Sequence, residues 1–132
     1  MTQEISKADL RAPDYFGHLL QACDRILQYT SGMTQDQFLA DSMVQDAVLR
    51  NIEILGEATR NLMECLPDLQ SIYPQIPWMD IYAMRNRVAH GYFYINHELV
   101  WSVTVKDIPE QRQQIAKALG EPQLVKAESA VD

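Results

Sequence analysis

The sequence contains no apolar stretch that approaches the roughly 20 residues needed for a membrane-spanning helix. Its first residues, MTQEISKADLR, also lack the hydrophobic core of a secretory signal. These two absences lead us to expect a cytoplasmic protein that does not contact a membrane.

Cysteine and histidine are scarce, with two and three copies in 132 residues. Cys23 and Cys65 fall inside helical patterns, which indicates buried thiols in a reducing compartment rather than a disulfide. Because no cysteine or histidine cluster is present, we predict no metal site. A glycine-rich phosphate loop is missing as well, and we expect no cofactor.

Positive charge is also in short supply, since the net charge is −7. Nucleic-acid-binding domains usually carry a basic patch, so this chain should have weak nonspecific affinity for RNA. Any RNA contact must therefore use locally concentrated charge. Arg85, Arg87 and His90 would form such a spot, and a symmetric dimer would double it.

What the chain does contain is the run Arg85-Asn86-Arg87-Val88-Ala89-His90-Gly91-Tyr92. A permanent cation can hold a phosphate and stabilise its developing charge, and a histidine can move a proton near neutral pH. The phenol of Tyr92 can orient either group or be modified. These groups suit cleavage of an RNA phosphodiester without a metal, although an arginine and a histidine near a helix end are common in any protein.

The spacing of the run restricts its geometry. Residues five apart on a helix are separated by about 140°, so Arg85 and His90 would not share a helix face. Gly91 favours a helix end, which predicts a helix over 78–90 with His90 in its last turn or cap and Tyr92 beyond. The core side of this helix should consist of Trp78, Ile81, Met84 and Val88. A helix C-terminus would favour protonated His90 by about 0.3–1 kcal/mol.

The remaining patterns are helical, and they predict a domain at 13–120 between an N-terminal arm, 1–12, and a flexible tail, 121–132. Pro13 should open the first helix, and Thr34 with Gln37 should form a capping box for a short one. A long helix should cover 43–65, and a further helix should begin near 97. Pro109 either kinks that helix or starts a new one, and Gly120-Glu121-Pro122 should end it.

The long helix has features that suggest contacts on more than one side. Ile52 and Ile54 widen its apolar stripe, and Gly56 is justified by a close approach of another helix. Asn51 could hydrogen-bond across an interface. Four charged residues lie on adjacent turns. They form either a solvated face, or a group that supports a neighbouring site or contacts a second subunit: Arg50, Glu53, Glu57 and Arg60.

Three stretches give the chain a resemblance to the HEPN superfamily, and within it to the HepT-like toxins. They are FLADSMVQDAVLRNIEILGEATRNL, IPWMDIYAMRNRVAHGYF and LVWSVTVKDIPEQRQQI, preceded by an amphipathic helix. The likeness covers roughly 13–119. The family motif is Arg, four residues, His, one residue, Tyr, with a polar residue after the Arg; Arg85, Asn86, His90 and Tyr92 match it.

This resemblance implies an all-α, up-and-down HEPN bundle, homodimeric, with four to five main helices plus a short one. It also implies a metal-independent endoribonuclease that yields a 2′,3′-cyclic phosphate and a 5′-OH. Arg85 would contact the scissile phosphate, with Arg87 as a supporting cation. His90 would act as general acid/base, and Asn86 would orient the phosphate or the His90 ring.

The family further implies the toxin of a toxin–antitoxin pair. Its partner would be a nucleotidyltransferase antitoxin (MntA-like) that transfers AMP onto Tyr92. Two alternatives remain open: a catalytically weak HEPN dimer that binds such a partner, and a plain helical adaptor. Tyr92 itself has an alternative as a core aromatic of the run Tyr92-Phe93-Tyr94.

Overall fold

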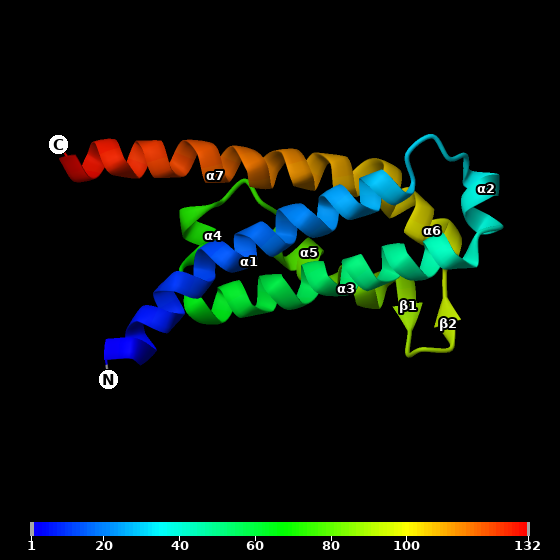
Figure 1. Cartoon of the computed structure of the whole chain (residues 1–132), viewed down its shortest axis with the longest axis horizontal. Coiled ribbons are helices and arrows are strands. Elements are labelled where there is room, and N and C mark those ends of the chain that lie inside the picture. Colours follow the sequence, from blue (N-terminus) through cyan, green and yellow to red (C-terminus); the bar gives the residue numbers. More distant parts are fainter. Residues whose placement is uncertain (1, 132) are drawn as a thin grey trace.

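The computed structural model describes the main chain of residues 2–131 and the side chains of residues 12–120. It is an all-α bundle, as predicted. Its helices are α1 (Thr2–Tyr29), α2 (Gln35–Leu39), α3 (Ser42–Cys65), α4 (Leu69–Ile72), α5 (Trp78–Val88), α6 (His97–Ser102) and α7 (Ile108–Val131). α1 packs against both α3 and α7, and the chain runs up and down through these three long helices (Figure 1).

The buried core lies where α1, α3 and α5 meet. Leu19 and Ile26 of α1 are fully buried together with Ile52 and Leu55 of α3. The buried face of α5 consists of the four residues predicted to line it, Trp78, Ile81, Met84 and Val88. This packing fixes which side of α5 faces solvent, and Arg85 lies on the edge of that side.

Local capping signals in the sequence are confirmed. The hydroxyl of Thr34 accepts a hydrogen bond from the Gln37 amide at 3.2 Å, and the Gln37 side-chain oxygen accepts one from the Thr34 amide at 2.9 Å. Asp41 caps α3, because its carboxylate accepts a hydrogen bond from the Val44 amide at 3.1 Å. These contacts satisfy amides that have no partner inside their helices.

Both predicted outer boundaries of the helical region are wrong. α1 begins at Thr2 and carries Pro13 in its interior, and α7 continues through Gly120 and Pro122 to Val131. Pro13 removes only one backbone hydrogen bond, while burial of Tyr15 and Phe16 anchors the turns that follow. Residues 1 and 132 lie outside the described residues, and the division into arm, domain and tail stays a prediction.

The predicted helix from 97 is confirmed, and its relation to Pro109 is resolved. A π-helical turn, η1 (Val103–Asp107), joins α6 to α7 in one unbroken helical run. The Ile108 amide donates to the Val103 carbonyl, five residues back. Because Pro109 has no amide hydrogen to donate, the wider turn just before it accommodates the missing bond.

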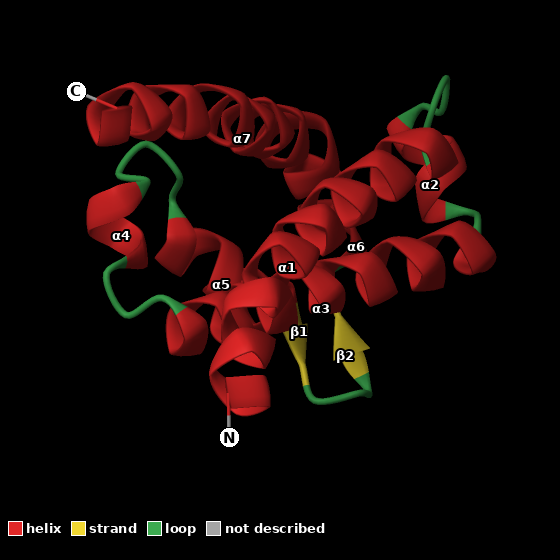
Figure 2. Cartoon of the chain, turned by 60° about the vertical axis from the view of Figure 1, so that its left-hand side comes forward, coloured by secondary structure: helices red, strands yellow, loops and turns green. Residues whose placement is uncertain are grey.

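A short β-hairpin replaces the predicted end of the motif helix. α5 stops at Val88, and β1 (Ala89–His90) pairs antiparallel with β2 (Tyr94–Ile95), placing His90 opposite Tyr94. Gly91 adopts a left-handed φ of 63°, which serves the hairpin turn rather than a helix cap. The hairpin projects from the helices beside α3 (Figure 2).

Within residues 2–131, no helix combines the length and the apolar character that crossing a membrane requires.

Candidate active site

The guanidinium of Arg85 is the best-anchored group of the motif. Arg85 lies in the last turn of α5, and its Nη2 donates a hydrogen bond to the Gly91 carbonyl at 2.8 Å. Its Nε lies 3.7 Å from a carboxylate oxygen of Glu53 on α3. The Arg85 side chain is about three-quarters buried, with 28% relative exposure, so its charge sits at a defined place on the surface.

His90 and Tyr92 flank the residue that Arg85 contacts. His90 is exposed on β1, with its ring centroid 6.0 Å from that of Tyr94. Tyr92 stands in the turn with 92% exposure, which rules out the core alternative for its side chain. The expected position of His90 in the last helical turn is wrong, because the chain is already extended at Ala89.

Asn86 and Arg87, the two other supporting residues, lie beside different hollows. Asn86 is exposed and lines the same hollow as Arg85. Arg87 faces a different hollow, where its Nη2 lies 2.6 Å from a carboxylate oxygen of Asp107. Within one chain, the expected positive spot is thus divided. Arg87 lies apart from Arg85 and His90, and its charge is paired with the Asp107 carboxylate.

An open hollow of about 360 Å³ lies between α3 and α5, next to Arg85. Its lining is dominated by charge: Arg50, Arg60 and Arg85 against Glu53 and Glu57. The helices are close here, since a Cβ on Gly56 would lie 3.4 Å from the Tyr82 carbonyl oxygen. This confirms the close approach predicted from Gly56.

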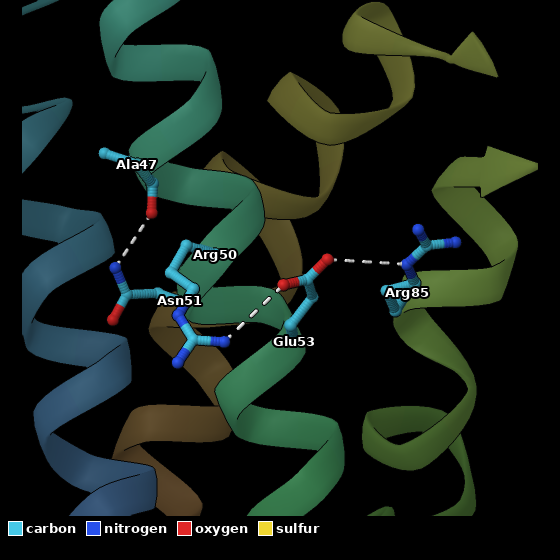
Figure 3. Close-up of polar contacts among 5 residues, drawn as sticks. All are labelled: Ala47, Arg50, Asn51, Glu53 and Arg85. Atoms are coloured by element: carbon cyan, nitrogen blue, oxygen red, sulfur yellow. Dashed lines mark hydrogen bonds and ion pairs between the residues drawn. The ribbon is translucent and has the colours of Figure 1, made fainter. Parts of the chain in front are cut away.

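Glu53 is one of the four charged residues for which the sequence left a supporting role open, but the sequence did not indicate Arg85 as its partner. Its carboxylate lies 3.7 Å from Arg50 on one side and 3.7 Å from Arg85 on the other (Figure 3). The charged face of α3 is therefore also a contact surface for the motif. The available signal was Gly56: a close approach at that position brings Glu53, one turn earlier, beside the facing helix.

Within the described residues, Asn51 donates its side-chain hydrogen bond inside its own helix, and a hydrogen bond across a subunit interface stays a prediction. Its side chain is 4% exposed, and its Nδ2 donates to the Ala47 carbonyl of the same helix at 2.8 Å. Figure 3 shows it on the side of α3 away from Arg85.

The two thiols are free, as predicted. Cys23 is buried, and burial raises the pKa of its thiol to about 12, with the neighbouring Asp24 carboxylate adding to the effect. Cys65 is partly buried. The raised pKa makes Cys23 a packing residue rather than a nucleophile at neutral pH.

Comparisons with known proteins identify the family of this chain. The family model of ribonuclease HepT-like proteins matches residues 19–118, which include the whole motif. A "Putative RNase" of Methanocaldococcus jannaschii is 35% identical over 115 residues, covering 87% of this chain and 91% of that protein. A "Probable ribonuclease HepT" of Thermococcus cleftensis is 32% identical over 104 residues, covering 79% and 92%. No solved structure matches the chain. The chain belongs to the ribonuclease HepT-like family of the HEPN superfamily.

Proposed function

We propose that this protein is a metal-independent endoribonuclease in which Arg85 and His90 act on the scissile phosphate of RNA. Family membership supports RNA cleavage. One observation carries the choice of residues: Arg85 donates a hydrogen bond to the carbonyl of Gly91, the residue between His90 and Tyr92. On a continuous helix, Arg85 and His90 would point in different directions. The hydrogen bond to Gly91 instead holds the Arg85 guanidinium next to the hairpin.

The chemistry follows from these groups. The ribose 2′ oxygen attacks phosphorus and the bond to the 5′ oxygen breaks, which gives a 2′,3′-cyclic phosphate and a 5′-OH. Arg85 stabilises the charge that grows on the phosphoryl oxygens. His90, exposed on β1, transfers a proton from the 2′-OH or to the departing oxygen. Asn86, exposed beside Arg85, orients the phosphate or the imidazole.

A homodimer would complete the site. Each turnover moves one proton off the 2′-OH and one onto the 5′ oxygen, whereas each chain contributes a single motif histidine. Two-fold symmetry would bring a second His90 and a second Arg85 to a shared cleft, and would concentrate positive charge on a chain of net charge −7. Light scattering should show a dimer at micromolar concentration; a stable monomer would contradict this part of the proposal.

The proposal includes a role as the toxin of a toxin–antitoxin pair, controlled at Tyr92. The almost fully exposed hydroxyl of Tyr92 is open to a nucleotidyltransferase antitoxin. Its oxygen would attack the α-phosphorus of ATP, releasing pyrophosphate and a proton. The attached AMP would place bulk and negative charge beside Arg85 and His90, which blocks an anionic substrate.

The decisive experiment compares His90→Ala with His18→Ala, which removes an exposed histidine from α1. In EDTA-containing buffer, His90→Ala should lower the RNA cleavage rate about 10²–10⁴-fold, as expected for loss of a proton-transfer group. Arg85→Lys should also fail, because lysine cannot make a two-pronged contact with phosphate. Cleavage by His90→Ala at the wild-type rate would contradict the proposed mechanism.

A second experiment addresses control. Intact-mass spectrometry after incubation with an MntA-like nucleotidyltransferase, ATP and Mg²⁺ should show added AMP on the wild type. Tyr92→Phe should remain unmodified. Equal labelling of both proteins, or of neither, would contradict control through Tyr92.

A further inference from the structure

The hairpin turn exposes an unusual amount of aromatic surface. Tyr92, Phe93 and Tyr94, here called the aromatic tip, have relative exposures of 92%, 79% and 52%. The other two phenylalanines of the chain, Phe16 and Phe38, are buried. The motif and its proposed chemistry use Tyr92 alone, so they leave the exposure of Phe93 and Tyr94 unexplained.

The Phe93 ring is held in place rather than left loose. It folds back over Gly91, where a Cβ would meet two of its ring carbons at 3.1 and 3.3 Å. The Tyr92 ring stands edge-on to it, with centroids 5.9 Å apart and planes at 82°. One side of the Phe93 ring is thus supported by the turn, and the residue remains largely open to solvent.

The Phe93 ring also lies close to Arg85, the cation proposed to bind phosphate, because Gly91 contacts both residues. Gly91 contacts the Phe93 ring through its Cα side and accepts the Arg85 hydrogen bond through its carbonyl at 2.8 Å. A nucleotide whose phosphate reaches Arg85 would therefore have the aromatic tip within its immediate surroundings. Both views of the molecule show the hairpin projecting beyond α3, so helices do not cover the tip (Figures 1 and 2).

We propose that the aromatic tip, with Phe93 as its main surface, stacks against an unpaired RNA base next to the scissile phosphate. The inference rests on the proposed ribonuclease function and adds a binding subsite to it. Aromatic side chains accept any base that is splayed out of a helix, whereas bases inside a duplex are already stacked. Stacking also suits a chain of net charge −7, because it contributes affinity that does not depend on many phosphate contacts.

The test measures binding without cleavage. In the His90→Ala background, fluorescence anisotropy gives the Kd for a labelled single-stranded RNA 12-mer and for the same strand in a duplex. Phe93→Ala should weaken binding of the single strand about 5- to 150-fold, the range expected for one lost stacking contact. Binding of the duplex should not change.

Two substitutions at the same position separate stacking from simple apolar contact. Phe93→Trp should keep the affinity, and Phe93→Leu should lose it, although leucine retains an apolar side chain. Tyr29→Ala, which removes an exposed aromatic ring from the end of α1, serves as the control and should leave the Kd unchanged. Full affinity of Phe93→Leu would overturn the proposal.

Salt dependence gives an independent readout. Phe93→Ala should leave the slope of log Kd against log salt unchanged, whereas Arg85→Ala should reduce it by about 0.7, the contribution of one phosphate on a single strand. If Phe93→Ala left RNA binding intact but abolished binding of the nucleotidyltransferase, the tip would be a protein-docking surface and the inference would be wrong.

The outcome stays separable from the fate of the ribonuclease proposal. Loss of single-strand binding in Phe93→Ala, combined with no cleavage by the wild type, would support the subsite and reject the reaction. Normal binding by Phe93→Ala, combined with cleavage by the wild type, would do the reverse.

Discussion

Gly91→Ala is a sharp test of how the site is held together, because two separate effects act at this position. The φ of 63° lies in the left-handed region, where a side chain costs about 1–2 kcal/mol. In addition, the new Cβ would lie 3.1 Å from the Phe93 ring, so the ring must shift by a few tenths of an ångström. This shift adds at most the roughly 0.5–1.5 kcal/mol of an off-rotamer side chain.

Gly32→Ala provides the matched control for the backbone effect. Gly32 has a φ of 75°, and a Cβ there would meet no atom within 4 Å. Urea unfolding followed by circular dichroism should therefore show a loss of about 1–2 kcal/mol for Gly32→Ala and a larger loss for Gly91→Ala. RNA cleavage should fall only in Gly91→Ala, since its carbonyl receives the Arg85 hydrogen bond.

The double variant Gly91→Ala/Phe93→Ala tests whether contact with the Phe93 ring causes the larger loss of stability. With the ring gone, the Cβ meets no aromatic carbon, and the excess loss of stability should disappear when compared with Phe93→Ala alone. Equal losses for Gly91→Ala and Gly32→Ala, or an excess that survives in the double variant, would refute the reasoning.

Three further predictions concern charge, burial and capping. Glu53→Gln should tighten binding of an uncleavable single-stranded RNA by up to about fivefold at low salt, because it removes a carboxylate 3.7 Å from Arg85 that competes with the phosphate for this cation, and such a pair attracts by about 1 kcal/mol in water. Glu64→Gln changes the net charge equally and should have no effect; equal Kd values for the two variants would contradict the prediction. The Cys23 thiol should resist thiol reagents at pH 8 until the protein unfolds, while Cys65 reacts in the folded state. Since the folded pKa of Cys23 is about 12 against 9.0 ordinarily, folding stability should fall from about pH 9 to pH 12, and less steeply in Cys23→Ala, as urea titrations would show. Thr34→Ala should lower the free energy of unfolding by about 1 kcal/mol, measured by thermal denaturation, because it removes the capping box of α2.

Sequence reasoning succeeded where the cause is local or periodic. The capping box at Thr34 depends on neighbours three residues apart, and the buried face of α5 follows the helical repeat from Trp78 to Val88. Such signals are complete within a short window of sequence. They sufficed for the all-α bundle and for the helix that carries Arg85.

The features that were not predicted from the sequence have a different physical origin. Strands of two residues, such as Ala89–His90, are too short to show any alternation, so the hairpin left no periodic signal. The ion pair of Glu53 with Arg85 depends on how α3 packs on α5, and Gly56 indicates only that some helix comes close there, not which helix. At Pro13 and Pro122, a residue that usually stops a helix lies within one.

The junction between α5 and the hairpin limits the insertions and deletions that this region can accept. Arg85 reaches Gly91 because three further helical residues and one two-residue strand lie between the cation and the turn. Inserting one residue before Val88 would rotate Arg85 by about 100° around the helix axis and shift it by about 1.5 Å. The Arg85 guanidinium would then no longer reach the Gly91 carbonyl, even if no residue were substituted. Sequence drift can therefore exchange residues within this stretch more readily than it can add or delete one.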